Sequence, residues 1–249
     1  MLRIVRKTLY YVYQVFILLP VVIVSTIVVG TLVTLISPLG SDRWRGWFSS
    51  FMGRCWGRII VRATLLPVEC TGMEHVVEGQ SYVIVANHES CYDIFLLIGF
   101  LNMKLRWMMK ASLMKIPFLG AASRVSGFIP VDTSTPAKIH ETYVHACKTI
   151  TNGVSLIVFP EGRRSYDGTV GAFKKGAFMI ADKLQLPVLP VTIHGTYEVM
   201  PRHRDFHFAR WCPLKIEIHP AIAPIGQGTD NVLHLKEKSR EAILSTPNQ

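Results

Sequence analysis

The stretch "VIVANHESCYDIF", residues 83–95, places a histidine and an aspartate directly after a short apolar run. With the two residues before it, the apolar run predicts a buried strand over 81–86, which ends at Asn87 and His88. Residues 91–100 predict the helix that follows, with Asp93 in its first turn. A buried strand that leads through a short polar loop into a helix is typical of α/β domains.

The same alternation continues along the chain. Further apolar strands are predicted at 105–109, 128–132, 154–159, 187–193 and 214–219. Helices are predicted at 136–151, 173–184 and 230–244, the last one charged and expected on the surface. Continuous apolar strands between helices predict an α/β fold, with a mostly buried mixed sheet flanked by helices.

The N-terminal part of the chain has a different composition. Residues 9–37 are almost wholly apolar and would extend about 40 Å as a helix, against about 30 Å for a bilayer core. The segment could cross a membrane with tilt or with a bend at Pro20. A signal peptide has a shorter apolar region and a small-residue cleavage site, so we expect a retained membrane anchor.

Residues 42–62 combine aromatic and basic residues at helical spacing. Arg54, Arg58 and Arg62 recur at every fourth position on a face away from the Trp and Phe residues. This pattern predicts a helix in the membrane interface, the alternative being an ordinary helix that packs onto the domain. The predicted division is an N-terminal anchor and interfacial helix at 1–64 and an α/β domain at 65–249.

Charge and cysteine content narrow the classes of function. The 249 residues carry a formal net charge of +10, which suits nucleic acid, anionic lipid or a phosphorylated substrate. No nucleic-acid motif is recognisable, and the basic residues gather beside the anchor and at strand ends, which favours lipid. The five cysteines have no metal-binding spacing and indicate reduced thiols.

His88 and Asp93 suggest acid–base chemistry. A reverse turn between strand and helix can bring the two side chains within hydrogen-bond reach, where the carboxylate would fix the imidazole tautomer. The pair could then take a proton from a hydroxyl of the substrate. A loop histidine beside an aspartate can equally be structural, so this spacing alone does not decide.

A second strand end carries groups suited to a phosphate. In "VSLIVFPEGRRSYDG", residues 154–168, an acid, a glycine and two arginines follow the strand. Gly162 allows close backbone approach, and Arg163 and Arg164 offer bidentate donors. Lys174 and Lys175 stand beside glycines at a predicted helix start. Solvated surface charge is the alternative for each basic group.

These blocks resemble the glycerolipid acyltransferase family that includes 1-acyl-sn-glycerol-3-phosphate acyltransferases. "NHESCYD" (87–93) is similar to the family's Asn-His-x-x-x-x-Asp block, and "FPEGRRS" (159–165) to its Phe-Pro-Glu-Gly-x-Arg-Ser block. "KIPFLG" (115–120) and "VLPVTI" (188–193) resemble two further family stretches. One departure is Thr133, which stands where the family has an arginine implicated in binding the acceptor's glycerol phosphate.

The resemblance implies a role for each site residue. His88 would be the general base and Asp93 would orient it, while Arg164 and Lys174 would hold the acceptor phosphate, with Lys110 or Lys175 as further candidates. The remaining expected substrate-binding residues, which shape the pocket or offer backbone N–H groups to the oxyanion, are Asn87, Glu161, Gly162 and Gly127.

The implied reaction transfers a fatty acyl group from acyl-CoA or acyl carrier protein to 1-acyl-glycerol-3-phosphate, which gives phosphatidic acid. No metal or cofactor is expected beyond the thioester co-substrate. Open alternatives are another lysolipid such as a lyso-aminolipid, glycerol 3-phosphate, or an idle lipid-binding scaffold. The expected partners are a lysophospholipid, the acyl donor and anionic membrane lipids. The expected location is a membrane with the catalytic domain on the cytoplasmic side, as in a bacterial inner membrane.

Overall fold

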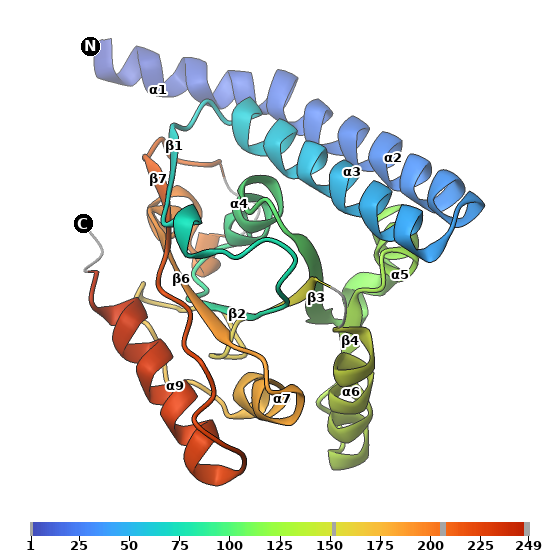
Figure 1. Ribbon diagram of the computed structural model, residues 1–249. Helices are drawn as coiled ribbons and strands as arrows, with labels where there is room; N and C mark the ends of the chain where they lie inside the picture. Colours follow the sequence, from blue (N-terminus) through green and yellow to red (C-terminus); the bar gives the residue numbers. More distant parts are fainter. Residues whose placement is uncertain (1, 151–152, 205–207, 247–249) are drawn as a thin grey trace.

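The computed structural model describes residues 2–150, 153–204 and 208–246 (Figure 1). The strands are β1 (Val68–Thr71), β2 (Val83–Ala86), β3 (Lys104–Lys110), β4 (Ile129–Val131), β5 (Val154–Val158), β6 (Val188–His194) and β7 (Leu214–Ile218). The α-helices are α1 (Leu2–Tyr13), α2 (Leu19–Ile36), α3 (Asp42–Ala63), α4 (Tyr92–Phe100), α5 (Leu119–Val125), α6 (Pro136–Thr149), α7 (Gly176–Leu184), α8 (Thr196–Val199) and α9 (Thr229–Leu244).

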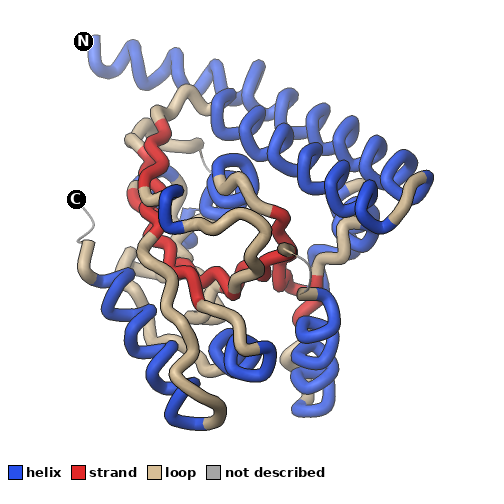
Figure 2. The backbone as a smooth tube through the Cα atoms, in the orientation of Figure 1, coloured by secondary structure: helices blue, strands red, loops and turns tan. Residues whose placement is uncertain are grey.

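All these strands join one mixed sheet, in the order β1-β7-β6-β2-β5-β3-β4 (Figure 2). The strands from β2 to β6 pair in parallel, and β7 turns antiparallel to β6. β2 lies between β5 and β6, with Val85 opposite Val158. The residues that follow β2 and β5 therefore leave the same edge of the sheet next to each other.

Both faces are buried at the centre of the sheet, which explains why β2, β5 and β6 are largely apolar. Ile84 and Ala86 point into a core that also contains Leu96 of α4. Val83 and Val85 point the other way, into a core completed by Phe178 of α7 and by α9. The predicted α/β class and mostly buried mixed sheet are confirmed.

The six predicted strands are confirmed to within two residues at each end. The predicted helix at 136–151 begins as expected, because the Thr135 side chain accepts a hydrogen bond from Lys138 N and Pro136 takes the first position. The sequence pattern missed β1, whose residues "VECT" form a strand through pairing with β7. The pattern also predicted that the helix at 230–244 lies on the surface. This helix, α9, is instead half-buried, because Val232, Leu235 and Ile243 face the core.

The N-terminal segment forms one helix of 35 residues, Val5–Leu39, that is long and apolar enough to cross a membrane. Instead of a bend at Pro20, a wider π-helical turn occupies Gln14–Leu18. Proline lacks the N–H that would bond one turn back, so a wider turn just before it is physically reasonable. α3 then runs back along this helix (Figure 1).

Hydrogen bonds tie the long helix to the rest of the chain. The Tyr10 and Tyr13 hydroxyls donate to the carbonyls of Thr64 and Ala63 at 2.7 and 2.9 Å. The buried Gln14 amide pairs both ways with the peptide of Ala209, at 2.8 and 2.7 Å. The helix therefore has one face bound to the protein and an outer face that is apolar and exposed.

α3 crosses α4 at a glycine pair, Gly57 and Gly99. A Cβ built at Gly57 would come within 2.7 Å of the Phe95 carbonyl oxygen and 2.8 Å of Gly99 N. Beside this crossing Arg58 Nε donates to the Gly99 carbonyl at 2.7 Å, in the last turn of α4. α3 ends at Ala63 and packs closely on α4 of the α/β part as well as on α2, so the division between 64 and 65 stays a prediction.

The predicted arginine face of α3 needs correction. Arg58 holds the C-terminal end of α4, and Arg54 donates to Asn102 Oδ1 at 2.9 Å. The last turn of a helix presents unpaired carbonyls and partial negative charge, which attract guanidinium groups. Two of the three arginines assigned to anionic lipid therefore bind within the protein.

We expect Gly57→Ala to lower the free energy of unfolding by about 1–3 kcal/mol, because the added methyl group meets backbone atoms. Gly53→Ala is the matched control in the same helix, since its Cβ would lie at an ordinary 3.5 Å from Ile98 Cγ2. That control should be neutral or gain up to about 1 kcal/mol from better helix propensity. Thermal unfolding in a neutral detergent measures both, and equal melting temperatures for the two variants would contradict the close crossing.

Candidate active site

His88 and Asp93 meet at the carboxyl end of β2. His88 Nδ1 lies 2.7 Å from Asp93 Oδ2, and the His88 side chain is 14% exposed while that of Asp93 is fully buried. The predicted contact between the two side chains is confirmed. Because Nδ1 faces the carboxylate, Nε2 is the ring nitrogen left to act on a substrate.

Asp93 is fixed by more than the imidazole. Its Oδ2 also accepts hydrogen bonds from Glu89 N at 2.8 Å and Ser90 N at 2.9 Å. An oxygen that accepts these two N–H groups is placed to accept from the imidazole as well, so the hydrogen between the two side chains is assigned to His88 Nδ1. This assigns the Nδ1–H tautomer of His88, with Nε2 unprotonated.

The loop after β5 holds the backbone of His88 from both sides. Glu161 Oε1 accepts from His88 N at 2.9 Å, and Glu161 Oε2 accepts from Gly171 N at 2.8 Å. Ser165 N donates to the His88 carbonyl at 2.7 Å. Burial raises the pKa of the Glu161 carboxyl, and the two backbone N–H donors oppose that rise. Glu161 thus joins the His88 loop to the loop after β5 through both of its carboxylate oxygens.

Asn87 does not face the substrate region, which corrects its predicted role. Its Nδ2 donates to Glu89 Oε1 and to the Ile193 carbonyl, while its Oδ1 accepts from Ile193 N at 2.8 Å. The side chain is buried, with its amide hydrogen-bonding capacity used by the protein. Asn87 therefore joins the end of β2 to β6 and keeps the His88 loop in place.

Gly162 and Lys174 lie against each other. Gly162 has φ +74°, and a Cβ there would lie 2.6 Å from Lys174 Nζ. Only glycine both adopts this backbone conformation readily and leaves room for the ammonium group. Lys174 N donates to the Pro160 carbonyl at 2.8 Å, so the lysine is fixed beside the loop that holds His88.

The other predicted cations follow the same edge of the sheet. Arg164 is half-buried between Glu161 and Ser165, and its carbonyl accepts from Arg202 at 3.3 Å. Arg163 and Lys175 are exposed, and Lys110 ends β3. We call these cations, Arg163, Arg164, Lys174, Lys175 and Lys110, the basic rim, and Lys174 Nζ lies beside Gly162 of the Glu161 loop.

Residues 127–133, "GFIPVDT", contribute no cation at position 133, where the family has an arginine and this chain has Thr133. Asp132 beside it pairs with Lys138 at 2.7 Å and accepts from Ser134 N at 2.9 Å. These bonds hold the pKa of the exposed Asp132 carboxyl well below its usual range. The acid therefore organises the start of α6, and a phosphate would have to be bound by the basic rim.

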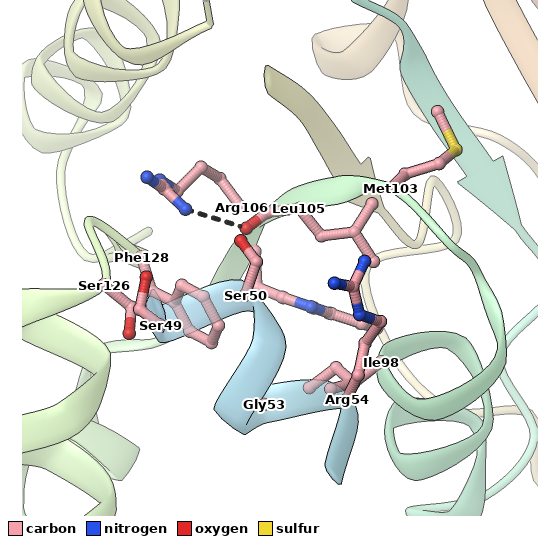
Figure 3. A pocket seen from close by; sticks show the side chains of 11 residues that line it. Ser49, Ser50, Gly53, Arg54, Ile98, Met103, Leu105, Arg106, Ser126 and Phe128 are labelled. Carbon is pink, nitrogen blue, oxygen red and sulfur yellow. Dashed lines mark hydrogen bonds between the residues drawn. The ribbon is translucent and has the colours of Figure 1, made fainter. Parts of the chain in front are cut away.

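Gly127 lies apart from His88, which corrects its predicted place in the site. It has φ +72°, and a Cβ there would lie 3.0 Å from Arg106 Nε. The neighbouring Ser126 and Phe128 line a small pocket with Arg106 and Arg54 on the α3 side of the sheet (Figure 3). Gly127 thus makes room for an arginine side chain.

The backbone N–H groups of Gly127 and Gly162 are also engaged. Gly127 N donates to the Arg124 carbonyl and Gly162 N to the Phe159 carbonyl, both at 3.0 Å. A donor already used in a tight turn is poorly placed to stabilise an oxyanion. The prediction that these two N–H groups stabilise the oxyanion is therefore corrected, because both already donate to backbone carbonyls.

Phe159 is a site residue that our sequence reasoning missed. Its ring stacks on the His88 imidazole with the centroids 3.8 Å apart and the planes 8° from parallel. Trp107 of β3 contacts the same phenyl ring, with centroids 5.7 Å apart. The available signal was an aromatic residue at the end of a predicted strand, in the block that also carries Glu161 and Arg164.

Comparison with known proteins agrees with this arrangement. Residues 67–194, more than half of the chain, match the family model described as Acyltransferase. A 1-acyl-sn-glycerol-3-phosphate acyltransferase from chloroplasts of Brassica napus is 34% identical over 161 residues, which cover 64% of this chain and 46% of that relative. One from Saccharomyces cerevisiae is 30% identical, with 84% of this chain and 68% of the relative covered.

A solved structure extends the likeness to almost the whole chain. The crystal structure of the 1-acyl-sn-glycerophosphate (LPA) acyltransferase PlsC from Thermotoga maritima has a TM-score of 0.77 and 28% identity, with 99% of each chain covered. By contrast, this chain spans just under half the length of the chloroplast relatives it matches. The family model and the shared fold establish that the chain belongs to the acyltransferase family.

Proposed function

We propose that the protein is a 1-acylglycerol-3-phosphate O-acyltransferase, which moves a fatty acyl group from a thioester to the free hydroxyl of 1-acyl-glycerol-3-phosphate. The observation that carries the proposal is the His88–Asp93 pair, with Nδ1 held at 2.7 Å and the ring partly exposed. The relatives named above support lysophosphatidic acid as the acceptor. The donor is acyl-CoA or acyl carrier protein, and no other cofactor is invoked.

The reaction follows from the geometry of the imidazole. Nε2 of His88 takes the proton of the acceptor hydroxyl while the oxygen attacks the thioester carbonyl. Asp93 stabilises the imidazolium that forms. The tetrahedral intermediate then collapses, the C–S bond breaks, and the thiolate takes the proton back from His88. The products are phosphatidic acid and the free thiol of the carrier.

Arg164 and Lys174 are proposed to hold the acceptor phosphate. Both belong to the chain segment around Glu161, whose carboxylate is bonded to His88 N, so phosphate and base are positioned by one set of loops. A guanidinium forms bidentate bonds to phosphate, and an ammonium adds a point charge. These two cations would take over phosphate binding from the family's arginine, since this chain has Thr133 at that position.

Arg164→Ala should raise KM for lysophosphatidic acid by about 10- to 100-fold, because a hydrogen bond to a charged group contributes about 1.5–3 kcal/mol. Arg163→Ala is the matched control, since this neighbouring arginine is exposed. It should change KM less than about three-fold. Steady-state acylation assays measure both, and equal effects of the two substitutions would contradict a specific role for Arg164.

A panel of acceptors distinguishes the proposal from its alternatives, which are acylation of another lysolipid, acylation of glycerol 3-phosphate, and an idle lipid-binding scaffold. The wild type is assayed on lysophosphatidic acid, a lyso-aminolipid, glycerol 3-phosphate and lysophosphatidylcholine, each with acyl-CoA and acyl carrier protein. Preference for lysophosphatidic acid supports the proposal, and preference for another acceptor replaces it. Absence of turnover on every pair, with lipid still bound by folded protein, would indicate an idle lipid-binding scaffold.

We further propose that the long helix lies along a membrane surface. Its bonds to Thr64, Ala63 and Ala209 keep it across the domain, so it does not lead away from the protein. Its outer face is apolar, with Phe16 71% and Leu35 65% exposed. A helix with one bound face and one exposed apolar face fits the headgroup and acyl boundary. Attachment on the cytoplasmic side of a bacterial inner membrane is part of this proposal.

We propose that the cations that contact anionic lipid are one at the start of α3 and one at the start of β3. Arg43 and Lys104 line a hollow of about 380 Å³ together with Trp44 and Trp47, whose rings are 5.3 Å apart. Among the described residues, neither cation has a recorded acidic partner. Indole rings and basic groups together favour the headgroup region of a bilayer.

The double change Arg43→Glu and Lys104→Glu should remove most of the preference for anionic vesicles, because each basic residue contributes about 1 kcal/mol at the surface. Lys236→Glu with Arg240→Glu on α9, far from α3 in Figure 1, is the charge-matched control. Flotation of the full chain with phosphatidylcholine vesicles, with and without phosphatidylglycerol, measures the preference. If the α9 variant loses as much, net charge alone explains the binding.

A further inference from the structure

The His88 ring is held by one hydrogen bond at Nδ1, which fixes one ring atom. A planar ring with a single fixed atom can still pivot about the line from Cβ to Nδ1. Pivoting would move Nε2, the atom that must face the acceptor hydroxyl. Base catalysis requires that hydroxyl within about 3 Å of Nε2, so a second restraint on the ring would have a direct effect on turnover.

The phenyl ring of Phe159 supplies that restraint. The two rings stack nearly parallel, 3.8 Å between centroids and 8° between planes. No room is left for the imidazole to tilt toward this face. The face of an aromatic ring also attracts a cation, so the contact strengthens when His88 becomes an imidazolium during the reaction.

The position of Phe159 is itself well determined. Pro160 restricts the backbone of Phe159 to extended conformations, and the Phe159 carbonyl accepts from Gly162 N at 3.0 Å. Trp107 is buried and contacts the phenyl ring with centroids 5.7 Å apart and planes 48° apart. The chain thus holds Phe159 through its backbone and through its side chain.

We propose that Phe159 is a positioning residue for the acyltransferase reaction: its ring keeps the His88 imidazole in the plane that joins Asp93 to the acceptor hydroxyl. The inference rests on the proposed function, in which His88 is the general base. Trp107 supports the phenyl ring from behind. A residue that acts on the base without touching substrate should affect kcat and leave KM for the acceptor almost unchanged.

The test compares Phe159→Leu with Phe159→Tyr in the full chain, assayed on lysophosphatidic acid and acyl-CoA. Leucine keeps much of the apolar volume and loses the flat ring, so kcat should fall about 5- to 10-fold, in line with an aromatic pair. KM should stay within about two-fold. Tyrosine keeps the flat ring and should restore kcat to within about two-fold of the wild type.

Phe100→Leu is the matched control, because Phe100 packs on the same core but at the far end of α4. It should cost stability without lowering kcat. If Phe159→Leu does not fold, Phe159→Met carries the comparison, because the flexible methionine side chain fills irregular gaps in a core. Normal kcat in the folded Leu or Met variant, or a loss in the Tyr variant as large as theirs, overturns the inference.

The His88→Ala variant separates this inference from the proposed function. An inactive His88→Ala enzyme with normal kcat in Phe159→Leu removes the positioning role alone. An active His88→Ala enzyme removes the general base, and with it the reaction mechanism on which the inference rests.

Discussion

Replacing His88 by alanine is expected to lower kcat for lysophosphatidic acid acylation by about 10²- to 10⁴-fold, the usual contribution of a general base. The fold should survive, because His88 lies in the loop after β2 and its backbone bonds to Glu161 and Ser165 do not depend on the imidazole. A radiolabelled acyl-transfer assay measures turnover, and circular dichroism reports on the fold.

His140→Ala is a suitable control, because His140 is exposed on α6. Among the described residues, Tyr143 is the aromatic side chain that its ring contacts. It should leave turnover within about two-fold of the wild type. Turnover of His88→Ala above a tenth of the wild-type value would show that another group removes the proton.

Asp93→Asn is expected to lower kcat by about 10²-fold, at the lower end of the same range. The asparagine oxygen can take the place of Oδ2 and keep the bonds from His88, Glu89 and Ser90. Its NH₂ group would then occupy the position of Oδ1, which is buried and has no recorded partner among the described residues. An unpaired buried donor costs about 1–3 kcal/mol, and the negative charge facing the imidazolium is lost.

The matched carboxylate is Asp132, which is exposed and paired with Lys138. Asp132→Asn should leave kcat unchanged within about two-fold. The comparison of kcat for the two asparagine variants, with thermal unfolding measured alongside, separates loss of the imidazolium partner from loss of a carboxylate in general. Equal activities of the two variants would remove Asp93 from the mechanism.

The centre of the sheet could be predicted because β2, β5 and β6 are largely apolar on both faces and end at a polar loop. That pattern is local, so 83–86 and 154–158 were found from their own residues. His88 and Asp93 were also a local pair, because a strand–loop–helix connection brings positions five apart together. The β1 strand was missed because its pairing with β7 joins residues far apart in the chain.

The rest of the site depends on contacts between distant segments. The bond of Asn87 to Ile193 joins residues 106 positions apart, and no spacing reveals that this amide is already used. Gly127 was expected to offer a backbone N–H to the oxyanion, whereas in the structure it lies against the Arg106 side chain. The stacking of Phe159 on His88 follows from strand order, since β2 and β5 are neighbours in the sheet and separate in the chain.

The reciprocal amide–peptide pairing of Gln14 and Ala209 bears on attempts to make a shorter, water-soluble form of this protein. Removing residues 1–40 would leave the Ala209 peptide unpaired and would uncover the side of α3 on which Trp56 now bonds to Thr26 at 3.0 Å. Arg210 N, next to Ala209, donates to the Val199 carbonyl at 2.9 Å, and the carbonyl of neighbouring Met200 accepts from Ser90 Oγ beside the Asp93 turn. Truncation would therefore disturb the catalytic loops as well as the lipid-facing surface, and polar substitutions on the outer face of the helix are the better route to solubility.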